Sequence, residues 1–258
     1  MKKIWIGVGL VCALSLAGCG GGEEKKAETT PAPAAAPAAS PVEDANAATV
    51  TGKVTLDGAP PAAKALDMSA TPFCAKAHPE GAKSEEVVAN AGALKNAFVY
   101  IKSGLPDKTW PAPSQPVLLD QKGCMYSPHV VAVMAGQNIE VKNSDQTNHN
   151  IHPLPKVNQE WNESQPPGSE PKLKSFAREE ILVPVKCNIH PWMRSYIAVM
   201  NHPFFAVTGD DGTYTIKGLP PGTYTITVWH EKLAPTGMDQ QITVGAKESK
   251  TQDFTLKG

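Results

Sequence analysis

Residues 212–229, GTYTIKGLPPGTYTITVW, decide the fold of this chain. On both sides of the turn at 218–222, threonine alternates with tyrosine, isoleucine, valine and tryptophan, which predicts half-buried β-strands. Residues 130–133 and 138–142 flank Gly136 and are predicted to form a hairpin. Further strands are predicted at 49–56, 97–101, 180–186 and 195–200. Because no segment has a helical period of useful length, we expect an all-β protein built from sandwiches.

The N-terminus has the pattern of an export signal. Lys2 and Lys3 precede an apolar run over 4–16 that is too short to span a bilayer comfortably. The run ends in LAGC, residues 16–19, which resembles the bacterial lipoprotein box. The resemblance implies a signal peptide over 1–18, acylation of Cys19 and a place in the cell envelope on a bacterial membrane. Gly20 after this cysteine favours the outer membrane. Stable attachment needs more than one acyl chain.

Residues 19–48 are predicted to be a disordered tether, because they are rich in alanine and proline and contain no aromatic residue. The remaining 258 − 48 = 210 residues suffice for one large β domain or two of roughly 100 residues each. The formal charge is 24 − 25 = −1. Since the chain has neither a basic stripe nor a base-stacking motif, no nucleic-acid partner is expected.

The segment CNIHPWM, residues 187–193, places a thiolate, an imidazole and a thioether within seven residues. Together with a second imidazole, this is the ligand set that prefers copper in an electron-transfer site. The segment NSDQTNHNIH, residues 143–152, offers that imidazole. The predicted ligands of one copper ion are His149, Cys187, His190 and Met193.

The five cysteines have separate predicted roles. Cys12 leaves with the signal peptide, Cys19 is acylated and the cysteine of the CNIHPWM segment binds metal. Cys74 and Cys124 remain, and in an exported protein they are interpreted as a disulfide. The alternative is that one or both join a metal site, for which His78 is the only nearby candidate.

Two segments far apart share one family resemblance. Residues 210–224, DDGTYTIKGLPPGTY, and the opening strand at 52–58, GKVTLDG, resemble the carboxypeptidase regulatory-like, transthyretin-type β-sandwich. The resemblance implies that residues 106–200 are inserted into this sandwich, beginning within the proline-rich stretch 105–116. The alternative is two sandwiches that share strands. The sandwich itself is then assigned to residues 49–105 and 201–258.

The inserted segment resembles a second family. Its motifs are AGQ at 135–137, VKNSD at 141–145, HNIH at 149–152 and CNIHPWM at 187–193. They resemble the cupredoxins, most closely the amicyanin and plastocyanin branch. The resemblance implies a cupredoxin-like Greek-key sandwich with a type 1 (blue) copper site, and it makes the ring edge of His190 the electron port.

Residues beside the ligands have supporting roles in this interpretation. The resemblance implies that Asn150 bonds across to the cysteine loop. Pro191 is expected to stiffen that loop, and Trp192 to shield the metal. His152 lies on the other strand face from His149. It is interpreted as a hydrogen-bonding residue, with an accessory metal role as the alternative.

Three functions are compatible with these features. The first is a lipid-anchored copper protein that passes single electrons between redox proteins of the cell envelope. The second is a carbohydrate- or envelope-binding sandwich with a metal-free, degenerate cupredoxin lobe, in which Tyr214, Tyr224 and Trp229 form a sugar platform rather than core. The third is a Cu(I) trafficking protein. No enzyme is expected, because neither a second metal cluster nor a hydrolytic constellation is recognisable.

Overall fold

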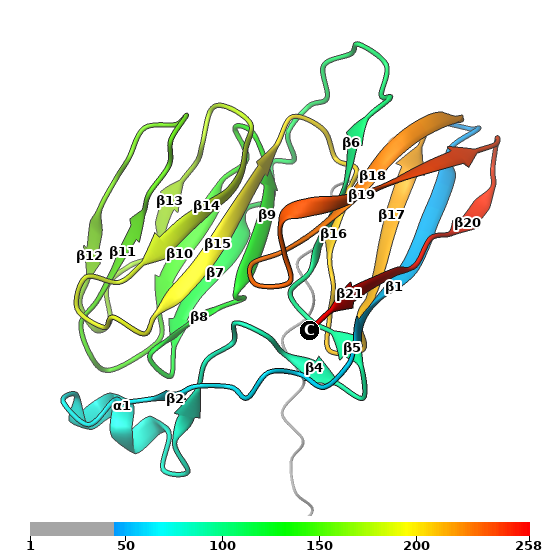
Figure 1. Cartoon of the computed structure of the whole chain (residues 1–258). Helices are drawn as coiled ribbons and strands as arrows, with labels where there is room; N and C mark the ends of the chain where they lie inside the picture. The colour runs from blue at the N-terminus through cyan, green and yellow to red at the C-terminus, as the bar shows by residue number, and fades with distance from the viewer. Residues whose placement is uncertain (1–43) are drawn as a thin grey trace, which may run out of the picture. The chain divides into compact units, whose positions relative to one another are not determined.

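A computed structural model describes residues 44–258, whose regular secondary structure is almost entirely β-strand (Figure 1). The prediction of an all-β protein is confirmed. One helix, α1 (Pro72–Ala77), interrupts this part of the chain. No helix within 44–258 is long and apolar enough to cross a membrane. The signal peptide, Cys19 and most of the tether lie outside the described residues.

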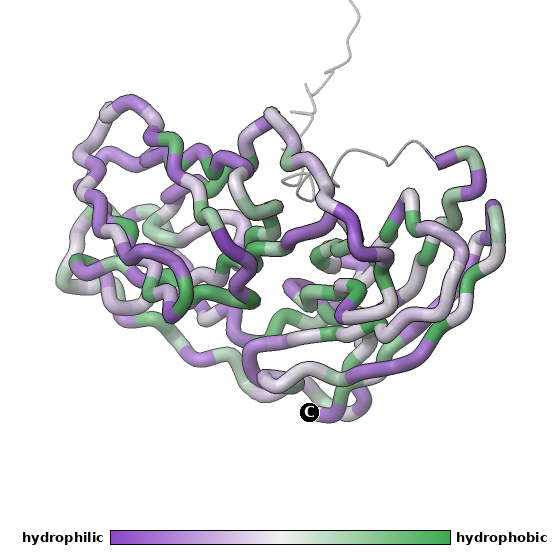
Figure 2. The backbone as a smooth tube through the Cα atoms, turned by 90° about the horizontal axis from the view of Figure 1, so that it is seen from above, coloured by the Kyte–Doolittle hydropathy of each residue, from purple (hydrophilic) through white to green (hydrophobic). Residues whose placement is uncertain are grey.

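Two sheets built from residues near both ends of the described chain form one sandwich, the flanking sandwich. One sheet has the order β17-β1-β5-β4, with β20 and β21 also paired to β1, and the other has the order β16-β6-β18-β19. Buried positions alternate with less buried ones along most of β17 and in the first half of β18. Figure 2 shows hydrophobic and hydrophilic residues interspersed along the backbone. The strands are β1 (Ala48–Asp57), β4 (Ala89–Asn90), β5 (Ala93–Leu94), β6 (Phe98–Ser103), β16 (Phe205–Val207), β17 (Thr213–Leu219), β18 (Gly222–His230), β19 (Ala234–Val244), β20 (Ser249–Thr251) and β21 (Phe254–Lys257).

Gly52 lies where strand β1 changes partners. Residues before it pair with β20, and those from Val54 onward pair with β21. A Cβ atom on Gly52 would lie 1.8 Å from the carbonyl oxygen of Gln252. Only glycine therefore allows the chain between β20 and β21 to approach β1 this closely.

Residues 117–200 form a second sandwich, the central sandwich. Its sheets have the orders β13-β10-β7-β8 and β12-β11-β14-β15-β9. Buried side chains from both sheets share one apolar core. The strands are β7 (Val117–Lys122), β8 (Met125–Ser127), β9 (Val130–Met134), β10 (Ile139–Asn143), β11 (His149–Pro153), β12 (Glu163–Gln165), β13 (Lys172–Lys174), β14 (Glu180–Lys186) and β15 (Arg194–Met200).

The hairpin predicted around Gly136 is wrong. Strand β9 pairs in parallel with β15, whereas β10 pairs with β7 and β13 in the other sheet. Both strands have the expected alternation, but the turn at Gly136 carries the chain across the sandwich rather than back along the same sheet. Alternation identifies a strand without identifying its neighbour.

Strand β9 is buried on both faces. Val131 and Val133 belong to the core of the central sandwich. Val130, Ala132 and Met134 point the other way and belong to the apolar core of the flanking sandwich. The uninterrupted apolar run VVAVM is what a strand covered on both sides requires.

A third unit, the cap, consists of residues 64–84. It contains β2 (Ala65–Leu66), α1 and β3 (Ala82–Lys83), and β2 pairs with β3. The sequence assignment put these residues in the sandwich formed by 49–105 and 201–258. That assignment is wrong for the cap, because Met68, Cys74 and Ala82 are buried in the core of the central sandwich. The cap is also joined covalently to that sandwich by the Cys74–Cys124 disulfide.

Candidate metal centre

The tip of the β14–β15 hairpin holds three of the four predicted ligands. The loop is closed by its own backbone, because the Cys187 N–H donates to the Met193 carbonyl at 3.3 Å and the Met193 N–H donates to the His190 carbonyl at 3.0 Å. The His190 N–H lies 3.4 Å from the Cys187 sulfur and donates to it. The spacing Cys-x-x-His-x-x-Met therefore folds into one tight turn.

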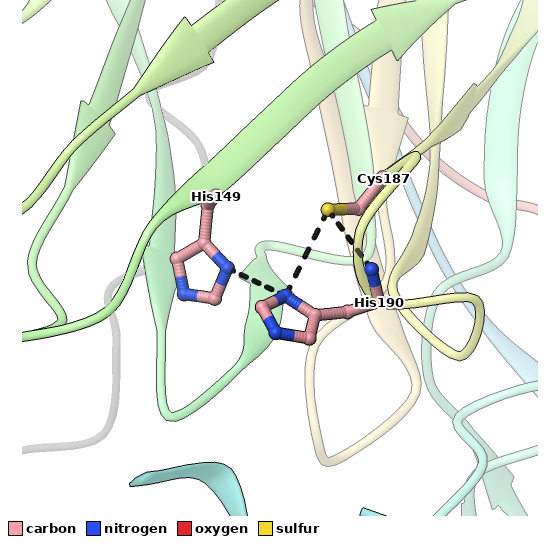
Figure 3. Close-up of side chains that lie close together, drawn as sticks. All are labelled: His149, Cys187 and His190. Atoms are coloured by element: carbon pink, nitrogen blue, oxygen red, sulfur yellow. Dashed lines mark hydrogen bonds between the residues drawn. The ribbon is translucent and has the colours of Figure 1, made fainter. Parts of the chain in front are cut away.

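His149 reaches the same place from the start of β11. Its Nδ1 atom lies 3.0 Å from Nδ1 of His190, which lies 3.8 Å from the Cys187 sulfur (Figure 3). One ligand atom from each of the three residues lies within 4.8 Å of the others. The exposed fractions are 0% for His149, 3% for Cys187, 1% for His190 and 0% for Met193. The four side chains are thus enclosed, and three of them converge on a common point.

Asp145 orients His149. Its Oδ2 atom lies 2.8 Å from Nε2 of His149, and since a carboxylate can only accept, the ring proton is on Nε2. The Nδ1 lone pair is then left facing His190 and Cys187. The same carboxylate accepts the N–H groups of Gly123 and Cys124, each at 2.7 Å. Asp145 therefore connects the first histidine to the β7–β8 turn.

That turn has an unusual backbone. Gly123 and Cys124 are consecutive residues with φ of 61° and 56°. Two positive φ angles are typical of a type I′ hairpin turn, in which a non-glycine residue is strained. The bonds to Asp145 offset the strain at Cys124, so the carboxylate stabilises the turn that carries half of the disulfide.

Neighbouring polar groups fix the ligand loop. The side-chain oxygen of Asn150 accepts the Asn188 N–H at 3.0 Å, which ties β11 to the loop. The Trp192 indole donates to the Cys124 carbonyl at 3.0 Å. The Tyr126 hydroxyl donates to the Asn150 carbonyl at 2.5 Å. Pro191 is exposed on the outside of the loop.

The electrostatics of the site favour the metal-binding form of its cysteine. Burial raises the pKa of the Cys187 thiol, but the neighbouring His149 ring and hydrogen bonds from backbone N–H groups outweigh burial and lower it below its ordinary value. Burial lowers the pKa of His149, but the bond to Asp145 and the nearby sulfur raise it overall. Burial and the charge of His149 lower the pKa of His190, so that ring favours the neutral form, which can ligate a metal.

The disulfide predicted between Cys74 and Cys124 is present. Its position was not predicted: the Cys74 sulfur lies 3.8 Å from Nε2 of His190, on the ring edge away from the other ligands. The resemblance made this edge the electron port. The structure instead covers it with the disulfide of the cap, and His190 is 1% exposed.

The other histidines lie outside the ligand group. His152 sits on the outer side of β11, with Nδ1 at 3.2 Å from Asn188 Oδ1 and Nε2 at 2.5 Å from Glu160 Oε1. His230, at the end of β18, is 1% exposed. His78 is close to the disulfide but contacts the Gly123 carbonyl rather than a sulfur.

The three aromatic residues that an alternative interpretation placed in a sugar platform are buried in the flanking sandwich. Their hydroxyl and indole groups bond to backbone carbonyls. The residues are Tyr214, Tyr224 and Trp229. Each ring packs in the apolar core while its polar group forms a hydrogen bond, which is a common role for tyrosine and tryptophan.

The sequence interpretation missed a polar cluster between the sandwiches. Nε2 of His129, in the loop before β9, lies 2.5 Å from Oε1 of Glu231, in the loop after β18. The Tyr196 hydroxyl donates to the other oxygen of Glu231 at 3.2 Å. The sequence around His129 does not indicate this contact, because its partner lies 102 residues away in the chain. The sequence interpretation also missed Asp145, although its position four residues before His149 was a usable indication.

Comparison with known proteins returns both families that the sequence motifs resemble. The profile of the carboxypeptidase regulatory-like domain matches residues 197–257. No curated protein sequence matches the chain.

Three solved structures illustrate the structural matches. A purple cupredoxin from Nitrosopumilus maritimus is 19% identical, with 32% of this chain and 97% of that one covered, at a TM-score of 0.28. An oxidised mutant of amicyanin is 17% identical, with 39% and 97% covered, at 0.30. The copper-containing nitrite reductase of Thermus scotoductus SA-01 is 19% identical, with 38% of this chain and 25% of that one covered, at 0.29.

Proposed function

We propose that the central sandwich binds one copper ion and that the protein carries single electrons. The ligands would be His149, Cys187 and His190, with Met193 as a weak fourth. Three such donors in a plane around one metal lie about 3.5 Å from one another, given bonds of about 2.0–2.3 Å. The two Nδ1 atoms are 3.0 Å apart and the sulfur is 3.8 Å from Nδ1 of His190. This convergence is the observation that carries the proposal.

The donor set matches the chemistry. A bound copper ion would supply a one-electron couple, and one soft thiolate with two imidazoles accommodates both of its oxidation states. Asp145 keeps the Nδ1 lone pair of His149 free, while Asn150 and the closed backbone of the ligand loop hold Cys187 and His190 in place. Since these side chains are held before the metal arrives, little rearrangement would accompany electron transfer.

Burial favours an electron carrier over a protein that delivers Cu(I). Delivery requires a partner's ligands to reach the metal, whereas all four proposed ligands are at most 3% exposed. An electron can cross a layer of packed side chains that a metal ion cannot. The cap over His190 adds to this barrier.

The proposed location depends on sequence alone. The segment LAGC at 16–19 supports acylation of Cys19 and attachment to a bacterial cell-envelope membrane, with redox proteins as partners. We expect Cys19→Ser to move the exported protein from the membrane fraction to the soluble fraction. Retention of that variant in the membrane fraction would contradict the anchor.

The copper site is tested by adding Cu(II) to the metal-free protein, both with its disulfide intact and after reduction of the disulfide and removal of the reductant. We expect one equivalent to bind and an intense thiolate-to-copper absorption at about 600 nm. Cys187→Ser should abolish the absorption while leaving the β-sheet circular dichroism unchanged. His152→Ala is the matched control, because this histidine lies beside the loop but outside the ligand group, and it should keep the band. If the wild type binds no copper in either redox state of this disulfide, the proposal fails.

Electron carrying is tested separately from binding. Repeated reduction by ascorbate and oxidation by ferricyanide, in the presence of a Cu(I) chelator, should cycle the absorption without loss of metal. Rapid transfer of copper to the chelator in the reduced state would instead favour trafficking.

A further inference from the structure

The cap is a self-contained unit that rests on the metal ligands. Its two ends are joined by the β2–β3 pairing, and the Ser84 N–H donates to the Lys64 carbonyl at 2.9 Å. Its helix α1 carries Cys74, which is fully buried. The Cys74 sulfur lies 3.8 Å from Nε2 of His190. The cap therefore closes the side of the site opposite the ligand atoms of this ring.

The other half of the disulfide is also against the site. The sulfur of Cys124, a carboxylate oxygen of Asp145 and a ring nitrogen of His149 lie within 4.8 Å of one another. Cys124 is fixed to the central sandwich, because its N–H is bound by Asp145 and its carbonyl by the Trp192 indole. The disulfide thus joins a firmly held residue of the sandwich to a residue of the cap.

Apart from the disulfide, the cap has few attachments. Within the described residues, and leaving Cys74 aside, one hydrogen bond joins it to the central sandwich, from the His78 ring to the Gly123 carbonyl at 2.6 Å. Met68 and Ala82 are buried against the core, and Leu66 and Phe73 are partly buried against it. Segments with few buried contacts open locally at low free-energy cost unless a covalent bond holds them.

We propose that the cap is a lid locked by the Cys74–Cys124 disulfide, and that metal enters and leaves the site only while both cysteines are thiols. The proposal rests on the proposed copper function. Locking is a thiol–disulfide exchange: the two thiols lose two electrons and two protons and form one S–S bond, and a disulfide oxidant becomes a dithiol. A dithiol reductant reverses the reaction. The two cysteines are thus a redox modification site. When the protein matures, the metal must bind before these cysteines are oxidised to the disulfide.

The lid is tested first on the metal-free protein, with Cys187 as a reporter. Iodoacetamide labelling is followed by peptide mass spectrometry, which resolves Cys187 from the other cysteines. We expect slow labelling in the oxidised wild type, and labelling at least about tenfold faster in Cys74→Ser/Cys124→Ser and in the reduced wild type. Lys76→Ala, an exposed change on the same helix that keeps the disulfide, is the matched control and should label as slowly as the oxidised wild type.

The second arm uses copper. Release of copper to a chelator should be slow from the oxidised protein and at least about tenfold faster from the double variant. Equal labelling and equal release in locked and unlocked protein would overturn the lid. If no sample binds copper but labelling of Cys187 still follows the disulfide, the copper function fails and the lid stands. Circular dichroism checks the fold of the variant, and the reduced wild type provides the same comparison without a substitution.

Discussion

Asp145 Oδ2 lies 2.8 Å from Nε2 of His149, and the same carboxylate binds the backbone N–H groups of Gly123 and Cys124. One buried acid thereby sets the tautomer of a proposed ligand and stabilises the strained turn that carries the disulfide. Burial raises the pKa of Asp145, but these bonds outweigh burial and lower it below its ordinary value. The carboxylate therefore stays ionised at neutral pH.

Replacing this acid should be costly. We expect Asp145→Ala to lower the free energy of unfolding by about 3 kcal/mol, because three buried donors lose their acceptor. Urea unfolding of the metal-free protein measures the change. Asp210→Ala, which removes an exposed partner of Lys95, is the control and should cost less than about 1 kcal/mol. Similar losses in both variants would show that the Asp145 bonds do not matter for stability.

Two buried histidines predict acid sensitivity. Burial lowers the pKa values of His202 and His230 to about 4 each, from an ordinary value of 6.5. Between these values the unfolded chain binds protons that the folded protein does not. Their stability contribution is therefore complete above pH 6.5 and is lost as the pH falls towards 4, by up to about 3 kcal/mol for each residue.

The measurement is urea unfolding at several pH values across this window. His230→Gln should reduce the loss of stability on acidification, because one titrating group has been removed. A wild-type unfolding free energy that stays constant between pH 6.5 and 4.5 would contradict the prediction.

The contact between Glu231 and the Tyr196 hydroxyl predicts a change in the pKa of this tyrosine when the carboxylate is removed. Burial and the charge of Glu231 raise the pKa of Tyr196 to about 12. We expect Glu231→Gln to lower this pKa while leaving it above the ordinary value of 10, because burial remains. Tyrosinate absorbance measures the titration, and subtraction of the Tyr196→Phe curve isolates the residue. An unchanged Tyr196 titration in Glu231→Gln would show that this carboxylate does not affect the pKa of the tyrosine.

Close backbone approach makes Gly52 hard to replace. Gly52→Ala should destabilise the protein by at least about 3 kcal/mol, because the new Cβ would overlap the Gln252 carbonyl and the backbone there cannot move freely. In the control Gly209→Ala the nearest atom would be Oδ1 of Asp211 at 3.7 Å, so a change within about 0.5 kcal/mol is expected. Thermal unfolding compares the two, and equal melting temperatures would refute the steric argument.

Local patterns predicted much of the candidate metal centre and eight of the strands, namely β1, β6, β9, β10, β14, β15, β17 and β18, but missed others such as β7 and β19. The conformation of the CNIHPWM segment is determined locally, because hydrogen bonds among its own residues close the turn between β14 and β15. Strand neighbours were harder to predict, as the wrong hairpin at Gly136 shows. Alternation reports which face is buried, but the partner across a sandwich depends on contacts far apart in the sequence.

The cap was the main feature that the sequence did not reveal. Residues 64–84 are rich in alanine and small polar residues and have no clear period, so their neighbours in sequence suggested the flanking sandwich. Their true position depends on one covalent bond to Cys124 and on a few buried side chains. The cover over His190 follows from the same bond, which is why the resemblance gave the wrong surroundings for that ring.

The two-sided burial of strand β9 limits how this protein can be divided. Excising the central sandwich would expose Val130, Ala132 and Met134 to water along a strand of high β-propensity, and the flanking sandwich would lose the apolar cover that they supply. An exposed apolar strand face of this kind favours aggregation. The central sandwich is therefore not an independent unit that could be transplanted alone, and the two sandwiches must fold together.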